Sequence, residues 1–335
     1  MKRNSKAGKV GIIDVAKEAG VSVATVSRVI NNKGNVSYET EILVKKAIEK
    51  LQFHPNVLGR SLRQQKTNVI LILVPSISNP FYSKIVEGIG NAALDCGYYT
   101  LLAETNSLKT REKELISILK EQMAAGIIWA DPASEDKYVS ELSKLYPVFV
   151  IAQILNNTVN SISIDNRKAV WDVVDHLYRR NRKRIAFLGN NINLHYNTFR
   201  YDAYLEAIKE YGISNYQKAV FPGFDIDAIK ESFNSIYNEK DACDSIISIS
   251  DVQNLYILEE AKANNIIIGK ELALIGFDNI GFTHIITPSL SSVDQPRYKF
   301  GYDATMNLID WIEGRNNCTK KIILEHKIIS RESTQ

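Results

Sequence analysis

The stretch "IIDVAKEAGVSVATVSRVI", Ile12–Ile30, determines how the N-terminal part of the chain is organised. Apolar residues recur at helical spacing in its first half, and Gly20 is a natural helix stop. Ser22 is a favoured N-cap for its second half, where valine and isoleucine again follow near-helical spacing. Only Ala19-Gly20-Val21 separates the two predicted helices. So tight a turn, with a glycine, predicts a helix-turn-helix unit, whose second helix enters the major groove of DNA.

The second predicted helix carries polar and small side chains where a DNA contact would need them. Three hydroxyl residues at this helix can donate to phosphates: Ser22, Thr25 and Ser27. The backbone N–H groups of the helix N-terminus can donate as well. Arg28 can offer a bidentate fork to guanine, while Val23 and Ala24 are small enough to meet thymine methyl groups. An ordinary amphipathic helix with its hydroxyls in water is the alternative interpretation of these residues.

A third helix is predicted from about Ser37 to Phe53, with an expected buried stripe of Ile42, Leu43, Ala47, Ile48 and Leu51. The segment around these helices is strongly basic. Residues 1–66 hold 13 Lys and Arg against 5 Asp and Glu, a net charge of +8; the remaining 269 residues hold 28 against 33, a net of −5. This asymmetry indicates a nucleic-acid-binding segment on an ordinary body, with a solvated basic tail as the alternative.

From Thr67 onward, short apolar runs alternate with amphipathic helical stretches. The runs are "VILILV" (69–74), "GIIWA" (126–130), "VFVIA" (148–152), "RIAFLG" (184–189), "SIISIS" (245–250) and "LALIGFD" (272–278). Continuous apolar strands joined by helices are typical of parallel sheets covered on both faces. The pattern occurs twice and breaks near "ISIDNRKAV" (162–170), which predicts two doubly wound subdomains with a cleft between them. The predicted fold class is therefore a small all-α helix-turn-helix head followed by an α/β body.

Several functional classes find no support in the sequence. No apolar run is long enough for a membrane span, and no secretory signal follows the basic N-terminus, so we expect a cytoplasmic protein. The glycines of "GIGNAALDCG" (88–97) fall inside a helical pattern and do not form a dinucleotide fingerprint. GxSxG, HExxH and P-loop motifs are missing, and the five histidines show no ligand spacing, so we expect neither an enzyme nor a metal or cofactor site.

The string "DVAKEAGVSVATVSRVIN" (14–31) closely resembles the signature of the LacI/GalR family of bacterial transcriptional regulators. The resemblance continues through "VSYETEILVKKAIEKLQFHPN" (36–56) and "RSLR" (60–63), then intermittently to about residue 314. It implies that the base readers are Val23, Ala24 and Arg28. It implies phosphate contacts from Ser22, Thr25, Ser27, Asn31 and Ser37. One departure is Gly11, which stands where the family usually has a capping threonine; glycine is a tolerable N-cap.

The same resemblance assigns a role to the segment between head and body. The counterpart of residues 56–63 in the family is a hinge helix that forms on operator DNA and inserts a leucine, here Leu62, into the minor groove. The hinge residues expected at the DNA are Asn56, Gly59, Arg60 and Leu62. Gly59 replaces the usual alanine, which costs about 1 kcal/mol in a helix interior. A plain flexible linker is the alternative.

The family body resembles periplasmic sugar-binding proteins, whose chain crosses three times between two subdomains. The resemblance implies a DNA-binding domain at residues 1–54, a hinge or linker at 55–66, and an effector-binding and dimerisation domain at 67–335. The first subdomain would comprise about 67–165 and 296–324, and the second about 166–295 and 325–335.

Candidate ligand-binding residues lie at predicted strand ends, where parallel sheets bind small molecules. By family order they are Phe81, Tyr82, Arg200, Phe224, Asp278 and Gln295, with Asp251 as a weaker candidate. Aromatic faces would stack on a sugar or base ring, and the polar groups would bond its hydroxyl or N–H groups. Ala152-Gln153 replaces an Asp-Arg pair common in ribose-type relatives, and Gln153 joins the candidates. Since no Lys/Arg cluster stands in its place, we expect a neutral sugar or nucleoside.

The resemblance therefore implies a homodimeric repressor that binds double-stranded, pseudo-palindromic operator DNA under the control of a small effector. Two alternatives stay open. A phosphocarrier protein could act as co-repressor and tighten DNA binding, or the chain could be a sugar-binding module without a DNA role.

Overall fold

The computed structural model describes residues 10–30, 34, 36–53, 67–155, 158–190, 195–237, 242–315 and 319–335. The chain divides into two compact units, Met1–Lys66 and Thr67–Gln335, called the head and the body below. Within the described ranges, no helix combines the length and the apolar character that a membrane span requires.

The head is built from three helices around a small apolar core. They are α1 (Ile12–Ala19), α2 (Val23–Ile30) and α3 (Tyr38–Lys50). Each contributes one fully buried valine, Val15, Val26 and Val44 respectively. The predicted stripe on the third helix was wrong at Leu43, which is 52 % exposed. The residue that faces the core is Val44, since it shares a helix face with Ala47, Ile48 and Leu51.

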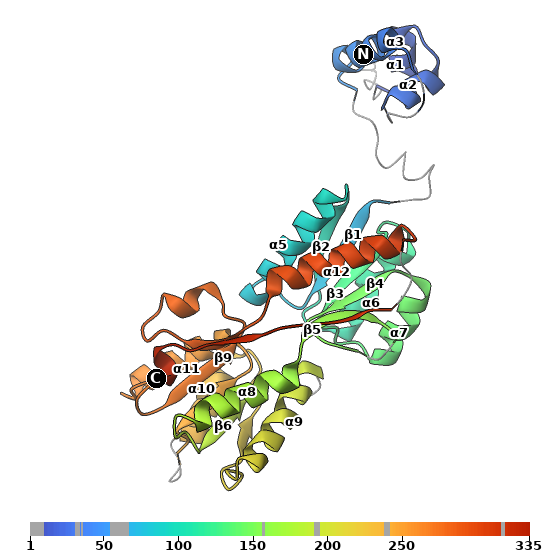
Figure 1. Cartoon of the computed structure of the whole chain (residues 1–335). Helices are drawn as coiled ribbons and strands as arrows, with labels where there is room; N and C mark the ends of the chain where they lie inside the picture. The colour runs from blue at the N-terminus through green and yellow to red at the C-terminus, as the bar shows by residue number, and fades with distance from the viewer. Residues whose placement is uncertain are drawn as a thin grey trace, which may run out of the picture. The chain divides into compact units, whose positions relative to one another are not determined.

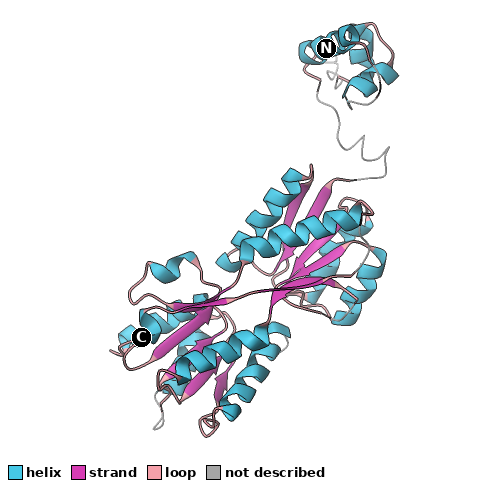
Figure 2. Cartoon of the chain, in the orientation of Figure 1, coloured by secondary structure: helices cyan, strands magenta, loops and turns pink. Residues whose placement is uncertain are grey.

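The first subdomain of the body is a six-stranded sheet with strand order β11-β5-β4-β3-β1-β2 (Figures 1 and 2). Its strands are β1 (Val69–Val74), β2 (Tyr99–Glu104), β3 (Gly126–Ala130), β4 (Val148–Ile151), β5 (Asn160–Ile164) and β11 (Lys321–Leu324). Its helices are α5 (Pro80–Asp95), α6 (Lys109–Lys120), α7 (Asp136–Leu145) and α12 (Arg297–Ile312). All neighbouring strands of this sheet are parallel.

The second subdomain repeats this plan with strand order β12-β10-β9-β8-β6-β7. Its strands are β6 (Ile185–Leu188), β7 (Lys218–Val220), β8 (Ser245–Ser248), β9 (Ala273–Phe277), β10 (Ser291–Asp294) and β12 (Lys327–Ile329). Its helices are α8 (Asn166–Tyr178), α9 (His195–Glu210), α10 (Ile226–Tyr237) and α11 (Asp251–Ala263), with the 3₁₀ turns η1 (Gly281–His284) and η2 (Glu332–Thr334). Only the β10–β12 pair is antiparallel among the described strands.

Three crossovers join the two subdomains. The chain passes from β5 to α8, from β10 to α12 and from β11 to β12 (Figure 1). The links are short: Asp165 alone lies between β5 and α8, and Gln295-Pro296 lies between β10 and α12. Three short links of this kind hold the two sheets together and leave the loops at their strand ends facing a common space.

Each sheet has apolar residues packed on both faces, as expected for parallel strands covered by helices; one core is shared by the two sheets, and the opposite face of each sheet has a core of its own. Along β1, Ile70 and Ile72 face a core that includes residues of α5 and α12, whereas Leu71 and Leu73 face one that includes residues of α6 and α7. The predicted fold class is confirmed, because the six apolar runs form β1, β3, β4, β6, β8 and β9. The remaining six strands were not predicted.

Helices α5 and α12 lie side by side on the first sheet, and two glycines permit the approach (Figure 1). A Cβ atom on Gly88 would overlap the backbone carbonyl of Tyr298, and one on Gly301 would overlap that of Ile85. Gly90, two residues further along α5, has open space around the position that its Cβ atom would take. The glycines of "GIGNAALDCG" therefore differ in purpose, and Gly88 is needed for helix packing.

We expect Gly88→Ala to destabilise the protein by at least about 2 kcal/mol, because backbone atoms cannot move aside as a side chain can. Gly90→Ala on the same helix is the matched control. It should be neutral or add up to about 1 kcal/mol, since alanine is the better helix former. Urea unfolding of the two variants measures both values. Equal unfolding free energies for the two would contradict the close packing of α5 on α12.

Candidate functional sites

The turn between α1 and α2 begins with a glycine that ends α1. Gly20 adopts a left-handed conformation with φ of 66°, and the N–H of Val21 bonds the carbonyl of Ala16 at 3.0 Å. This closes α1 as a glycine C-cap does. At the start of α1, Gly11 has no side chain with which to cap, but its own N–H donates to the Asp14 carboxylate at 2.8 Å. Asp14 therefore forms one of the two hydrogen bonds of a capping box; the other would need an N-cap side chain such as that of threonine.

The predicted base readers lie on the open face of α2. Val23, Ala24 and Arg28 are exposed, and Val23 remains 39 % exposed although its spacing alone would suit the core. Of the predicted phosphate contacts, Ser22 and Ser37 are exposed, and Thr25 and Ser27 are half-buried. The predicted Asn31, Asn56, Gly59, Arg60 and Leu62 lie outside the described residues.

Two of the predicted phosphate contacts also cap helices. Ser22 Oγ accepts from the Thr25 N–H at 3.1 Å at the start of α2, and Ser37 Oγ accepts from the Thr40 N–H at 3.3 Å at the start of α3. Each serine hydroxyl is also hydrogen-bonded to the hydroxyl of the same threonine, at 2.9 Å for Thr25 and 2.8 Å for Thr40, and lies beside the free N–H groups of a helix N-terminus. This arrangement suits an anion, because the helix N-terminus carries partial positive charge.

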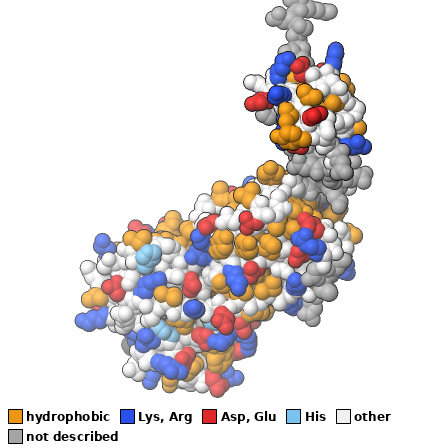
Figure 3. Space-filling view, turned by 45° about the horizontal axis from the view of Figure 1, so that its top comes forward, with side chains coloured by type: hydrophobic (Ala, Val, Ile, Leu, Met, Phe, Trp, Pro, Cys, Tyr) orange, Lys and Arg blue, Asp and Glu red, His pale blue; other side chains and the backbone are white. Residues whose placement is uncertain are grey.

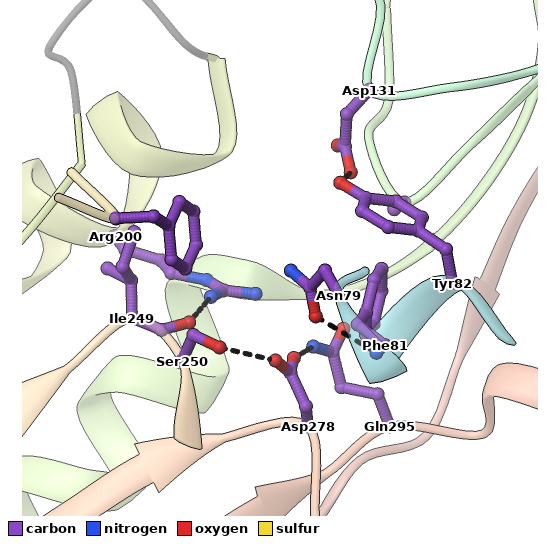
Figure 4. A pocket seen from close by; sticks show the side chains of 11 residues that line it. Asn79, Phe81, Tyr82, Asp131, Arg200, Ile249, Ser250, Asp278 and Gln295 are labelled. Atoms are coloured by element: carbon purple, nitrogen blue, oxygen red, sulfur yellow. Dashed lines mark hydrogen bonds between the residues drawn. The ribbon is translucent and has the colours of Figure 1, made fainter. Parts of the chain in front are cut away.

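In the body, polar and aromatic side chains meet between the two subdomains (Figure 4). Six of the eight predicted ligand residues line one pocket: Phe81, Tyr82, Arg200, Phe224, Asp278 and Gln295. They come from α5, α9 and the loops after β7, β9 and β10. Since the carboxyl ends of parallel strands share one edge of a sheet, both sheets deliver their loops to this space.

The aromatic residues form two walls. Phe81 and Tyr82 lie at the N-terminus of α5, with ring centroids 5.0 Å apart and planes at 79°, an edge-to-face pair. The N-cap of α5 is Asn79, whose side chain accepts from the Phe81 N–H at 3.0 Å. On the other subdomain, Phe224 is 42 % exposed, a large fraction for an aromatic ring in a pocket. An exposed ring of this kind can stack on a flat ligand face.

Arg200 and Asp278 are held in place before any ligand binds. Arg200 donates to the Asn166 side chain at 2.8 Å and to the Ile249 carbonyl at 2.9 Å, and its guanidinium lies 3.8 Å from the centre of the Phe277 ring. Asp278 accepts from Ser250 Oγ at 3.0 Å and from Gln295 Nε2 at 2.8 Å (Figure 4). Burial raises the pKa of Asp278, and the charge of Arg200 is the largest effect that opposes this rise.

Two predicted ligand residues do not line the pocket. Gln153 is 2 % exposed, and its neighbour Ala152 takes the lining position. Asp251 is the first residue of α11, and its side chain is fully buried inside the protein. Its Oδ2 accepts from the Ile280 N–H at 3.0 Å and from Ser292 Oγ at 2.9 Å. Asp251 therefore supports the loop after β9, and the preceding residue, Ser250, reaches the pocket instead.

Five lining residues were not predicted: Asn79, Asp131, Ala152, Ile249 and Ser250. Asp131 directly follows β3, in a left-handed conformation with φ of 45°. Its side chain is 5 % exposed, and Oδ2 accepts from the Tyr82 hydroxyl at 2.8 Å. Burial raises the pKa of Asp131 to about 7, with a smaller upward effect from Asp278. Asp131 could have been found from the sequence as an aspartate directly after an apolar strand, a feature that it shares with Asp278.

The space between these walls has two parts. The inner pocket just described has a volume of about 30 Å³, which is room for about one water molecule. It adjoins an outer cavity of about 360 Å³, with which it shares Asn79, Tyr82, Asp131 and Phe224. The outer cavity is within the size range of small-molecule sites.

The raised pKa of Asp131 predicts how stability depends on pH. The unfolded chain loses this proton near pH 3.8 and the folded chain only near 7, so ionisation costs folding free energy as the pH rises between these values. Asp131→Asn removes the cost. We expect its gain in unfolding free energy over the parent to be about 2 kcal/mol larger at pH 8 than at pH 5.5.

Urea unfolding at the two pH values measures this difference, and exposed Asp227→Asn serves as the control. A pH-independent difference between Asp131→Asn and the parent would show that Asp131 ionises as an ordinary surface carboxyl does.

Comparison with known proteins agrees with both parts of the chain. Residues 11–56 match the family model "Bacterial regulatory proteins, lacI family", and residues 67–332 match "Periplasmic binding proteins and sugar binding domain of LacI family". The chain is 31 % identical to the NTD biosynthesis operon regulator NtdR of Bacillus subtilis over 96 % of its own length and 99 % of that protein. It is 29 % identical to the HTH-type transcriptional repressor CytR of Escherichia coli, over 96 % and 95 %.

The fold is also that of a solved structure. The lac repressor dimer bound to operator and the anti-inducer ONPF superposes with a TM-score of 0.89 at 20 % identity, covering 98 % of this chain and 99 % of that one. The relatives are DNA-binding transcriptional regulators. The chain belongs to the lacI family of bacterial regulatory proteins, with the family's helix-turn-helix head and sugar-binding body.

Proposed function

We propose that the protein is a homodimeric transcriptional repressor that binds a pseudo-palindromic operator and responds to a sugar or nucleoside in the cleft. One observation carries the proposal: the chain combines an exposed α2 face with a preorganised pocket of aromatic and hydrogen-bonding side chains. A pure sugar-binding module would have no use for α2. Because an operator is chromosomal DNA, we place the protein in the cytoplasm. We expect no catalytic activity, since the sequence contains no known catalytic motif.

The pocket favours a hydroxylated ligand with a flat face. Phe81, Tyr82 and Phe224 offer rings for stacking, while Asp278 and Gln295 offer directed hydrogen bonds. An acidic ligand is disfavoured, because Arg200 is the one described cation of the inner pocket and already donates to Asn166 and Ile249. These features support the sugar or nucleoside expected from the sequence.

An exposed apolar surface on the first subdomain supports dimerisation. The edge strand β2 exposes Tyr99, Leu101 and Leu102 at 60, 41 and 42 %, and Leu94 on the neighbouring α5 is 64 % exposed. Figure 3 shows hydrophobic side chains gathered on the face of the body turned toward the viewer. Large exposed apolar patches mark protein interfaces, and an edge strand that is left open invites pairing. A second copy of the chain would cover both.

We also propose that residues 56–63 act as the hinge, with Leu62 as a minor-groove wedge. Effector binding in the cleft would then release operator DNA by separating the two hinges of a dimer. If instead a phosphocarrier protein served as co-repressor, substitutions inside the cleft would leave regulation intact.

Base reading by Arg28 gives the first test. Arg28→Ala should cost about 1–3 kcal/mol of binding free energy on the operator and relax specificity at one position per half-site, because the bidentate contact to guanine is lost. Ser27→Ala should weaken binding to operator and random DNA alike, as expected for a phosphate contact. Fluorescence titrations on both kinds of DNA compare the two. An equal loss of specific and random binding by Arg28→Ala would make it a phosphate contact.

The cleft gives the second test. Asp278→Asn should abolish the response of operator binding to effector, because one of the two acceptor oxygens becomes a donor. Operator affinity without effector and dimerisation should be unchanged, as measured by gel-shift titration and sedimentation. Arg200→Ala is the poorer variant, since it would leave two buried acceptors without partners and lower stability. A normal effector response in Asp278→Asn would place the effector elsewhere or favour a protein co-repressor.

A further inference from the structure

The two adjoining parts of the cleft differ greatly in volume. The inner pocket, of about 30 Å³, has room for about one water molecule, whereas the outer cavity, of about 360 Å³, has room for a small-molecule ligand. A pocket the size of one water molecule does not hold a sugar ring or a base. The body of a ligand must therefore lie in the outer cavity, and only a small group of it can enter the inner pocket.

The two parts follow each other along the strand ends. The inner pocket takes Asp131, Ala152 and Asp278 from the ends of β3, β4 and β9, and Gln295 from the crossover after β10. The outer cavity is lined by the loops after β1, β2, β6 and β7 and by α11. Since β2 and β7 are edge strands, the outer cavity lies toward the open edges of the two sheets and the inner pocket nearer the crossovers.

The turn after β2 shows that the outer cavity has a specialised wall. Asn106 and Ser107 line this cavity in left-handed conformations, with φ of 53° and 55°. Buried Thr105 holds the turn, because its Oγ1 donates to the Val74 carbonyl and accepts from the Ser107 N–H, both at 3.3 Å. Two successive left-handed residues other than glycine are uncommon, and such strain clusters at ligand sites. The strain here brings an amide and a hydroxyl residue to the cavity wall.

The chemistry of this wall suits a neutral ring with polar substituents. Tyr82 comes from α5 and Tyr256 from α11, so aromatic rings reach the outer cavity from both subdomains. Such rings stack on the apolar face of a sugar or on a base, while hydroxyl and amide side chains bond its polar edges. The described serine and asparagine residues of the wall are Ser76, Ser78, Asn79, Asn106, Ser107 and Asn190.

The inner pocket is built to recognise a single hydroxyl group. Asp278 accepts from Ser250 Oγ and from Gln295 Nε2 (Figure 4). A carboxylate has about four acceptor positions, so Asp278 can accept a further bond, and the Gln295 amide has a second N–H to donate. A group bound between these two side chains must donate and accept at once. A hydroxyl does both, whereas an ammonium group only donates and a carbonyl only accepts.

We propose that the effector carries an exocyclic hydroxymethyl group, whose hydroxyl enters the inner pocket and bonds Asp278 and Gln295 while the ring lies in the outer cavity. The methylene supplies the reach, because it places the hydroxyl one bond further from a ring that cannot follow. Hexopyranoses and ribonucleosides both carry this group, and pentopyranoses do not. The inference rests on the proposed function, since it takes the cleft as the effector site, and it makes Gln295 a residue that determines specificity.

The test uses the full-length protein in calorimetric titrations with pairs of probes that differ only in this group. D-glucose is paired with D-xylose, D-galactose with L-arabinose and D-mannose with D-lyxose. Adenosine and cytidine are paired with their 5′-deoxy derivatives, which lack the hydroxyl. In at least one pair the hydroxymethyl compound should bind about tenfold or more tightly, because a site built to bond a hydroxyl rejects the analogue that lacks it.

Two variants separate the parts of the cleft. Gln295→Leu removes the amide at similar side-chain size, and it should reduce the preference within the pair to about twofold or less without weakening the lesser ligand. Tyr256→Ala acts in the outer cavity only, so it should weaken both members of the pair by the same factor. Exposed Asp227→Asn is the control and should change neither affinity.

The outcomes distinguish this inference from the proposed function. Pentoses or 5′-deoxynucleosides that bind as tightly as their counterparts overturn the inference and leave the proposed function standing, as does a preference that survives in Gln295→Leu. Binding of none of these compounds overturns the inference and also removes the support for a simple sugar or nucleoside effector. If Gln295→Leu folds poorly, the paired titrations of the parent protein decide alone. Sugar pairs and nucleoside pairs show which of the two classes supplies the group.

Discussion

The cleft depends on the parallel arrangement of both sheets. In a parallel sheet every strand delivers its following loop to the same edge, so a six-stranded sheet gathers several loops in one place. Three short crossovers then keep the two edges facing each other, and one of them contains Gln295 of the pocket wall. Residues as distant in sequence as Asn79 and Gln295 become neighbours because of this geometry.

The buried polar groups around the cleft divide into supports and contacts. Asp251 holds the backbone after β9 through Ile280, and this loop places Asp278, whose φ of 104° is unusual for a residue other than glycine. The Asn279 N–H donates in turn to Ser292 Oγ at 2.9 Å, and Arg297 donates to the Asn279 carbonyl at 2.9 Å. Such supports fix the pocket before a ligand arrives, which lowers the entropic cost of binding. Asp131 has no comparable set of donors.

The sequence predicted the parts that obey local rules. Continuous apolar runs identified the central strands, because strands buried on both faces need apolar residues at every position. The edge strand β2 ("YTLLAE") and strand β5 ("NSISI") were not predicted, because serine and threonine interrupt their apolar pattern. The serine side chain can nevertheless be fully buried, as at Ser161. Only tertiary packing tells a buried serine from a surface one.

The ligand residues were predictable to the extent that family order located them. That order led to Asp278 but passed over Asp131, although both directly follow apolar strands. It also favoured the carboxyl of Asp251 over the hydroxyl of Ser250. Which of these two neighbours faces the pocket depends on the first turn of α11, and a one-residue difference of that kind cannot be read from periodicity.

Strand β1 runs from the start of the body to the cleft. It follows the segment of residues 54–66, and its start is tied down by Thr67, which donates to the Met123 carbonyl, and by Asn68, which donates to that of Gly97. At its other end, Pro75 and Asn79 line the cleft. Between these ends the strand is paired on both edges and covered on both faces, so it cannot stretch or bend independently. A displacement of the loop after β1 would therefore reach Thr67 at the start of the strand, because the strand between them cannot deform independently.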